Sequence, residues 1–342
     1  MHPSTSSLTF GAEFETVCPL DRHAAARRVT EITGLPVFSA MGTAPAGSWK
    51  IVSDGSIRGR GHPLEFVSPV LSGQAGLDQV AAFVNALKAI GCAVNTSTGF
   101  HVHVGRPTTR IDFFKNLLKL YGRFEEAIDS FMPASRRGNG AYYCRTIKAI
   151  SREAIERAIT VQDLQAAQVR ASGADSPKYH KVNLSPAGKP TVEFRQHSGT
   201  VDAAKAVNWI NTCLRLVALA NEGKTGEGTA QMIAWDLARL SGKQAHCASL
   251  IARAEGATND EIRVAFGYRT ISARKQLKDA NLPFREVKDA ATGKVRFHQV
   301  GMMSPGSSEA VNYPATLDGL ADLIEATPEQ RAFFARRATT AS

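Results

Sequence analysis

The chain has 342 residues, of which 43% are hydrophobic and 21% charged, a composition typical of a globular protein large enough for two domains. No apolar run approaches the roughly 20 residues of a transmembrane helix, and the first residues lack the pattern of a secretory signal, so we expect a cytoplasmic protein without membrane contact. Five scattered cysteines, none in a CxxC pair, argue against a disulfide framework or a structural zinc site. The net charge of +10 favours anionic partners such as nucleotide phosphates, acidic substrates or nucleic acid.

Short strand-like runs alternate with helical patterns over the first two thirds of the chain. The predicted strands cover residues 8–15, 49–52, 63–67, 99–104, 181–184 and 191–195, and the predicted helices cover 22–33, 75–90, 110–130, 151–169 and 202–221. The connections vary too much in length for a regular series of βαβ units. This order therefore predicts an α+β fold with a mostly antiparallel sheet, in a first domain of residues 1–228.

A smaller unit is predicted at residues 245–300, after a linker at 222–228 and a helical stretch to about 241. Its elements are a helix at 245–254, a helix from Asn259 capped by Thr258 and Glu261, a helix near 270–280, and strands at 284–287 and 295–300. Three helices followed by a hairpin are the order of a winged helix. Residues 301–342 are predicted as a loose segment and a final helix at about 316–336.

Polar and apolar side chains alternate along several of the predicted strands, so the polar ones share one face of each strand. These polar residues are Glu13 with Glu15, His101 with His103, Glu193 with Arg195, and the single acid Glu65. Unpaired buried charges cost several kcal/mol each, and divalent cations would remove that cost. Magnesium prefers oxygen ligands shared with phosphates, and an arginine can bind a phosphate or carboxylate through two hydrogen bonds. Together these residues predict one shared site.

Each part of this pattern also has a simpler interpretation. Glu13 and Glu15 alone would fit an exposed strand edge. The two histidines alone would fit a zinc site or a structural role, and Glu193 with Arg195 would fit a local ion pair on a surface strand. The clustering of so many titratable groups favours the shared site.

Six motifs, in order along residues 7–220, resemble the amidoligases, relatives of glutamate–cysteine ligase and glutamine synthetase. The motifs are Gly11–Glu15, Trp49–Ser56, Leu64–Pro69, Ser97–Gly105, Tyr179–Leu184 and Thr191–Thr200. The resemblance implies a glutamine synthetase-type sheet that lines a catalytic funnel, with ATP entering from one side and the acid and amine from the other.

By this resemblance, five residues would hold two or three magnesium ions, with manganese as an alternative: Glu13, Glu15, Glu65, His101 and Glu193. His103 would face ATP. Arg195 would bind the transferring phosphoryl group or the substrate carboxylate, and with Glu193 it is the predicted catalytic pair.

Other residues in or near these motifs are expected to assist the site. Lys50 and Asp54 lie in the second motif, and we expect Lys50 to contact the nucleotide. Arg145 or Lys148 would supply another phosphate contact. His180 and His197 are expected to support the site or to be structural.

The implied reaction is an ATP-dependent ligation of a small-molecule or peptide carboxylate to an amine through an acyl-phosphate. Magnesium and arginine would offset the repulsion between the carboxylate and the γ-phosphate. One alternative is a phosphotransferase of the guanidino kinase type on the same fold. Another is a nucleic-acid-binding protein with an inactive ligase domain. Oligomeric state and the identity of the substrates are not predicted.

The C-terminal unit would present basic side chains on its second helix and its hairpin. They are Arg269, Arg274, Lys275, Lys278, Lys288, Lys294 and Arg296. They suit contacts to nucleic acid phosphates, and they equally suit a solvated face of a module that contacts protein or positions substrate.

Overall fold

The protein divides into two compact units, Met1–Thr225 with Pro314–Ser342, and Gly226–Tyr313. The structure, a computed structural model, describes residues 5–40, 42–186, 189–226, 247, 250, 257–266, 272–279, 284–288, 295–299 and 313–338. The second unit is thus an insertion in the first, and its two ends meet where the Tyr313 N–H donates to the Gly226 carbonyl at 3.2 Å. The sequence predicts a separate segment at 301–342, whereas the part of it from Pro314 onward belongs to the first unit.

The first unit is built on one open sheet. Its strands are β1 (Thr9–Cys18), β2 (Val37–Ser39), β3 (Trp49–Ser53), β4 (His62–Val67), β5 (Leu71–Ser72), β6 (Phe100–Gly105), β7 (Val182–Asn183) and β8 (Thr191–Phe194). The strand order is β2-β3-β4-β1-β6-β8-β7, with β5 on β1, and every pair except the parallel β2–β3 pair is antiparallel. The predicted α+β fold with a largely antiparallel sheet is confirmed, while the glutamine synthetase-type assignment stays a prediction.

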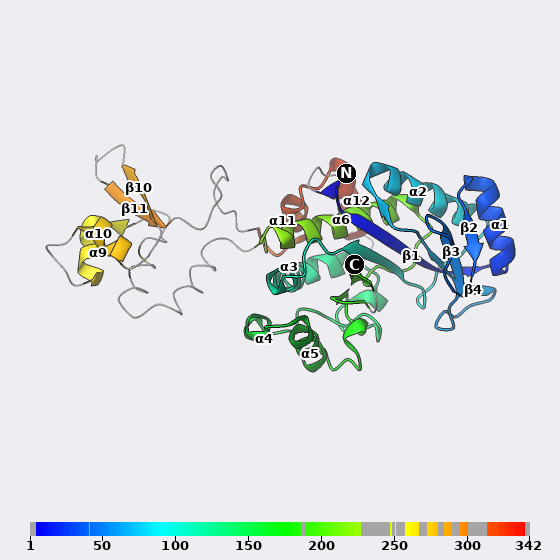
Figure 1. Cartoon of the computed structure of the whole chain (residues 1–342), viewed down its shortest axis with the longest axis horizontal. Helices are drawn as coiled ribbons and strands as arrows, with labels where there is room; N and C mark the ends of the chain where they lie inside the picture. The colour runs from blue at the N-terminus through cyan, green and yellow to red at the C-terminus, as the bar shows by residue number, and fades with distance from the viewer. Residues whose placement is uncertain are drawn as a thin grey trace. The chain divides into compact units, whose positions relative to one another are not determined.

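Helices pack side by side against this sheet (Figure 1). They are α1 (Arg22–Thr33), α2 (Gly73–Ala89), α3 (Ile111–Ser130) and α6 (Ala203–Asn221), with α4 (Arg152–Arg157) and α5 (Val161–Ser172) beside α3. The single helix predicted over 151–169 is wrong, because the chain is extended at Ala158 and restarts at a capping box of Thr160 and Asp163.

Aromatic side chains fill the space between the sheet and the helices. Phe14, Phe66 and Phe100 come from neighbouring strands and Trp49 from β3, and all are buried. Phe83 of α2 meets Trp49 face to face and Phe66 edge to face, and the stacked rings of Phe14 and Phe100 are 4.5 Å apart. Because side chains alternate along a strand, this packing turns the residues between these aromatics to the other face of the sheet.

Two helices follow the insertion, α11 (Leu317–Leu323) and α12 (Pro328–Ala338). The single helix predicted over 316–336 is wrong, because Glu325 adopts a φ of 52° just before α12 starts at a proline. Phe334 of α12 lies 5.1 Å, ring to ring, from Phe131. No helix in the described part of the chain is both long enough and apolar enough to cross a membrane.

The second unit contains β9 (Ala257–Thr258), α9 (Asn259–Phe266), α10 (Ala273–Asp279), β10 (Phe284–Lys288) and β11 (Val295–Gln299). The strands form an antiparallel sheet in the order β10-β11-β9. The predicted cap is confirmed, since the Thr258 N–H donates to Glu261 Oε2 (2.8 Å) and the Glu261 N–H to Thr258 Oγ1 (3.2 Å). Of the helix predicted at 245–254, only Cys247 and Leu250 are described, and both are helical. The helical stretch predicted before 241 lies outside the described residues, and the winged-helix assignment stays a prediction.

Only part of the predicted basic surface of this unit is described. Arg269 and Lys294 lie outside the described residues, as do the side chains of Lys278, Lys288 and Arg296. Arg274 donates to both carboxylate oxygens of Glu286, each at 2.5 Å, so its charge is already paired. Both Arg274 and Lys275 are exposed. Nucleic-acid binding by this unit stays a prediction.

Candidate active site

Strand pairing brings the predicted acids and histidines together on one face of the sheet. Residues directly opposite each other on neighbouring strands are Glu13 and His101, Glu15 and Glu65, and His103 and Glu193. Four adjacent strands, β4, β1, β6 and β8, therefore contribute to one polar cluster. Strand order thus brings together the residues that alternation predicts to share a site.

Glu13 lies at the centre of this cluster. Its Oε1 lies 3.1 Å from His103 Nε2, and its Oε2 lies 3.6 Å from His101 Nδ1. Two sets of side chains could each hold a metal ion: Glu13 with His103 and Glu193, and Glu13 with Glu65 and His101. Within each set the ligand atoms lie within 4.8 Å of one another. Glu13 belongs to both sets, so it could bridge two cations.

Two of the carboxylates are anchored through one oxygen and leave the other facing the cluster. The Gly99 N–H donates to Glu15 Oε2 at 2.6 Å, and Asn183 Nδ2 donates to Glu193 Oε2 at 2.8 Å. The remaining Oε1 atoms lie 3.7 Å (Glu15) and 3.8 Å (Glu193) from the His101 ring nitrogens. Hydrogen bonds of this kind orient metal-binding carboxylates.

His103 is held in the same way. Its Nδ1 lies 3.1 Å from Thr191 Oγ1, which fixes the ring. Its Nε2 is buried and, although it lies 3.1 Å from Glu13 Oε1, makes no hydrogen bond among the described residues. A buried polar atom without a partner is costly, and a metal ion or ligand would satisfy it. The donor set of carboxylates and imidazoles suits manganese as well as magnesium.

The environment separates the pKa values of the acids. Burial alone would raise the pKa of Glu13, but His101 and His103 beside it hold that pKa well below its usual range. Burial is likewise outweighed at Glu193, whose pKa is lowered chiefly by Arg195. At Glu65, burial and the charges of neighbouring acids raise the pKa to about 8. The protonated Glu65 carboxyl thus limits the negative charge of the cluster at neutral pH. A bound cation would favour its ionised form instead.

Arg195 lies beside the cluster. Its guanidinium forms an ion pair with Glu193 Oε1, and its Nε lies 3.4 Å from the Tyr143 carbonyl. Burial opposes the charge, yet the Glu193 carboxylate raises the pKa of Arg195, so the guanidinium stays charged. The structure thus places both predicted catalytic residues at the edge of the predicted metal site.

The expected nucleotide-binding residues lie less centrally. Lys50 is on the polar side of β3, opposite Val67, which in turn pairs with Glu13. Arg145 donates to the Asn139 carbonyl at 3.0 Å, and neither Lys50 nor Arg145 makes a recorded contact to the acids within the described ranges.

Two other assigned residues have local partners. The charge of Asp54 helps to raise the pKa of Glu65, which places Asp54 near the cluster. Lys148 forms an ion pair with Glu126.

His180 and His197 fit the structural alternative. His180 is buried, with Nε2 2.8 Å from Ser172 Oγ, and burial lowers its pKa. His197 is buried between the rings of Phe100 and Trp209.

Four further residues of the site were not assigned from the sequence: Gly99, Asn183, Lys189 and Thr191. Gly99 and Thr191 lie two residues before His101 and Glu193, so alternation places them on the same face. Asn183 lies in the motif Tyr179–Leu184. Lys189 comes from the β7–β8 connection, and its Nζ lies 2.9 Å from Glu13 Oε1. No periodicity marks a loop residue, so only the fold reveals it.

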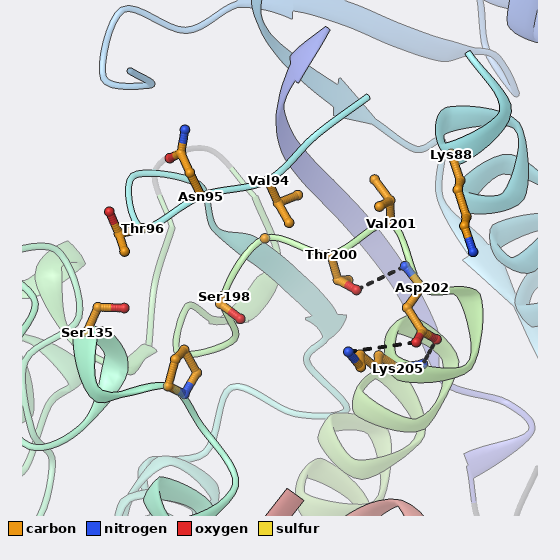
Figure 2. A pocket seen from close by; sticks show the side chains of 12 residues that line it. Lys88, Val94, Asn95, Thr96, Ser135, Ser198, Thr200, Val201, Asp202 and Lys205 are labelled. Carbon is orange, nitrogen blue, oxygen red and sulfur yellow. Dashed lines mark hydrogen bonds and ion pairs between the residues drawn. The ribbon is translucent and has the colours of Figure 1, made fainter. Parts of the chain in front are cut away.

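A separate hollow lies outside this cluster (Figure 2). It has a volume of about 460 Å³ and is lined by twelve residues, including Lys88, Asn95, Ser135, Ser198 and Asp202. Figure 2 shows Asp202 held by Thr200 and Lys205. None of the predicted site residues lines it.

A sheet face with clustered acids, histidines and an arginine, whose pKa values are shifted in opposite directions, is typical of an enzyme active site. The family model described as "Putative amidoligase enzyme" matches residues 6–217, and the chain belongs to this family. Membership indicates an enzyme of the ligase type. No curated protein matches the chain.

Proposed function

We propose that the protein is an ATP- and magnesium-dependent carboxylate–amine ligase that forms an amide through an acyl-phosphate. The observation that supports this most is the pair of candidate cation sites that share Glu13. Family membership favours amide formation over other reactions of phosphate groups.

The residues that would hold the ions are Glu13, Glu15, Glu65, His101, His103 and Glu193. The family resemblance implies that His103 faces the nucleotide, but His103 also belongs to one of the two candidate cation sets, so it could bind metal. Bound divalent ions would supply positive charge against the phosphates and the developing oxyanions.

In the first step, a carboxylate oxygen of the substrate would bond to the γ-phosphorus of ATP, and ADP would leave. In the second, the amine nitrogen would attack the acyl carbon, and phosphate would leave as the amine loses a proton. Arg195, already charged and fixed beside Glu193, is placed to bind the phosphoryl group or the substrate carboxylate and to offset their repulsion. No covalent bond to the enzyme is needed.

The test is ADP release from ATP and magnesium, with acids and amines supplied in pairs. We expect turnover that depends on the acid, with a product mass equal to acid plus amine minus water. Glu13→Gln and Glu193→Gln should lower it by about 10²–10³-fold, because each change removes charge stabilisation from the transition state. Glu31→Gln, an exposed acid on α1, is the matched control and should leave it unchanged.

Two results would decide against the proposal. A stable phosphorylated product without amide would identify a phosphotransferase. Failure of the wild-type protein to bind ATP with magnesium would remove the catalytic interpretation altogether.

A further inference from the structure

Among the lysines that the structure describes, Lys189 is the one that contacts a proposed metal ligand. Its Nζ lies 2.9 Å from Glu13 Oε1, the oxygen that also approaches His103 Nε2. Its charge also reaches Glu65, whose raised pKa it partly offsets. Lys189 thus occupies the carboxylate that both candidate cation sites need.

Lys189 and Pro190 are held by backbone hydrogen bonds, whereas the Lys189 side chain is half-exposed. The Lys189 N–H donates to the Pro186 carbonyl at 3.1 Å, and the Arg106 N–H donates to the Pro190 carbonyl at 3.0 Å. The side chain itself is 50% exposed and rests on Glu13 alone among its recorded partners. An ammonium on a flexible stem can therefore leave Glu13 without any change in the fold.

Arg195 provides the contrast. Its side chain is 18% exposed and tied to both Glu193 and the Tyr143 carbonyl, so it is fixed. Among the described residues, the site thus has two basic side chains, the fixed Arg195 paired with Glu193 and the more exposed Lys189 paired with Glu13.

We propose that Lys189 is a catalytic residue that neutralises Glu13 in the metal-free protein and, when divalent ions take that carboxylate, moves to bind the terminal phosphoryl group of ATP. A divalent ion and an ammonium repel each other at one carboxylate oxygen, so the ion displaces Lys189. The terminal phosphoryl group would bring new negative charge to the same place, and a lysine is a common phosphate ligand. The inference rests on the proposed function.

The experiment compares Lys189→Gln, Lys189→Arg and wild type as full-length proteins. Manganese affinity is measured first, by calorimetric titration without nucleotide. We expect Lys189→Gln to bind manganese about tenfold more tightly, since an opposite charge at this distance shifts a carboxyl equilibrium by about one pKa unit. Lys189→Arg keeps the charge and should bind as wild type does.

Nucleotide affinity is measured next, at saturating manganese. Lys189→Gln should weaken the affinity for ATP by about tenfold, the effect of losing one charged hydrogen bond, and should leave the affinity for ADP unchanged. Lys88→Gln, at an exposed lysine outside the acid cluster, is the control for the loss of one positive charge.

The outcomes separate the two proposals. Unchanged manganese affinity in Lys189→Gln, or equal weakening of ATP and ADP, would overturn the role of Lys189 while the ligase proposal stands. If the wild-type protein bound no manganese, the ligase proposal would fail first.

Discussion

The two faces of the central sheet come from the same strands, yet they are stabilised in opposite ways. Phe14 and Phe100 stack on the face covered by helices, while their neighbours Glu13 and His101 meet on the other. The aromatic face is complete within the protein, since its rings are buried against each other and against α2. Among the described residues, the polar face keeps a buried imidazole nitrogen without a hydrogen bond and a carboxyl whose pKa is raised to about 8.

This difference indicates where ligands act. A packed apolar face gains its stability from burial and needs nothing further. A face of buried acids is electrostatically costly, and bound cations would lower that cost, so its free energy would depend on what binds there. Substitutions on the aromatic face should therefore change folding, and those on the polar face should change binding.

The largest effect is expected from Phe83→Ala. Phe83 is fully buried on α2, against Trp49 and Phe66. Its removal should lower the free energy of unfolding by about 3–5 kcal/mol through lost burial and a cavity. Denaturant titration measures this loss, and manganese affinity below the transition should stay close to that of wild type. A tenfold fall in affinity with little loss of stability would contradict the division between the faces.

Gly99→Ala tests the polar face. A Cβ at Gly99 would lie 2.8 Å from His101 Nε2 and 3.3 Å from Glu15 Oε2, so both ligands must shift. We expect manganese affinity to fall by about 10–100-fold, as when the supporting contacts of a metal site are lost. Gly122→Ala on α3 is the matched control, since its Cβ would meet nothing closer than 3.7 Å. Equal affinities in the two variants would show that Gly99 does not shape the site.

An effect confined to high pH is expected from Glu65→Gln in metal-free protein. The pKa of Glu65 is raised to about 8 in the folded protein, well above the value of about 4.3 in an unfolded chain. The folded protein therefore loses stability as the pH rises from about 4.3 to about 8, because the unfolded chain releases this proton more readily. The variant should therefore melt several degrees higher than wild type at pH 8.5, and at nearly the same temperature at pH 4.5. Thermal melts in chelator measure this, and a lower melting temperature at pH 8.5 would refute it.

Alternation along single strands was enough to predict the polar set, because side chains two residues apart share a face. It could not predict which strands are neighbours, and strand order is what places Glu65 opposite Glu15. Neither β2 nor β5 was predicted, since each is a run of only three or two residues, whereas the equally short β7 lies inside a longer strand-like run at 181–184. The approach of Lys189 to Glu13 depends on tertiary structure, as does the lack of contact between Arg145 and the acids.

The insertion of the second unit has a consequence for how this protein can be cut and rebuilt. Its ends are joined by the hydrogen bond between Tyr313 and Gly226, so the intervening segment could be excised or exchanged as a cassette with a short splice at its base. Ending the chain at Gly226 would be a different operation, because it would also remove α11 and α12, and with them the ring of Phe334 that packs on Phe131. The two shortened proteins would differ by a few dozen residues and by whether the hydrophobic core behind the sheet is left intact.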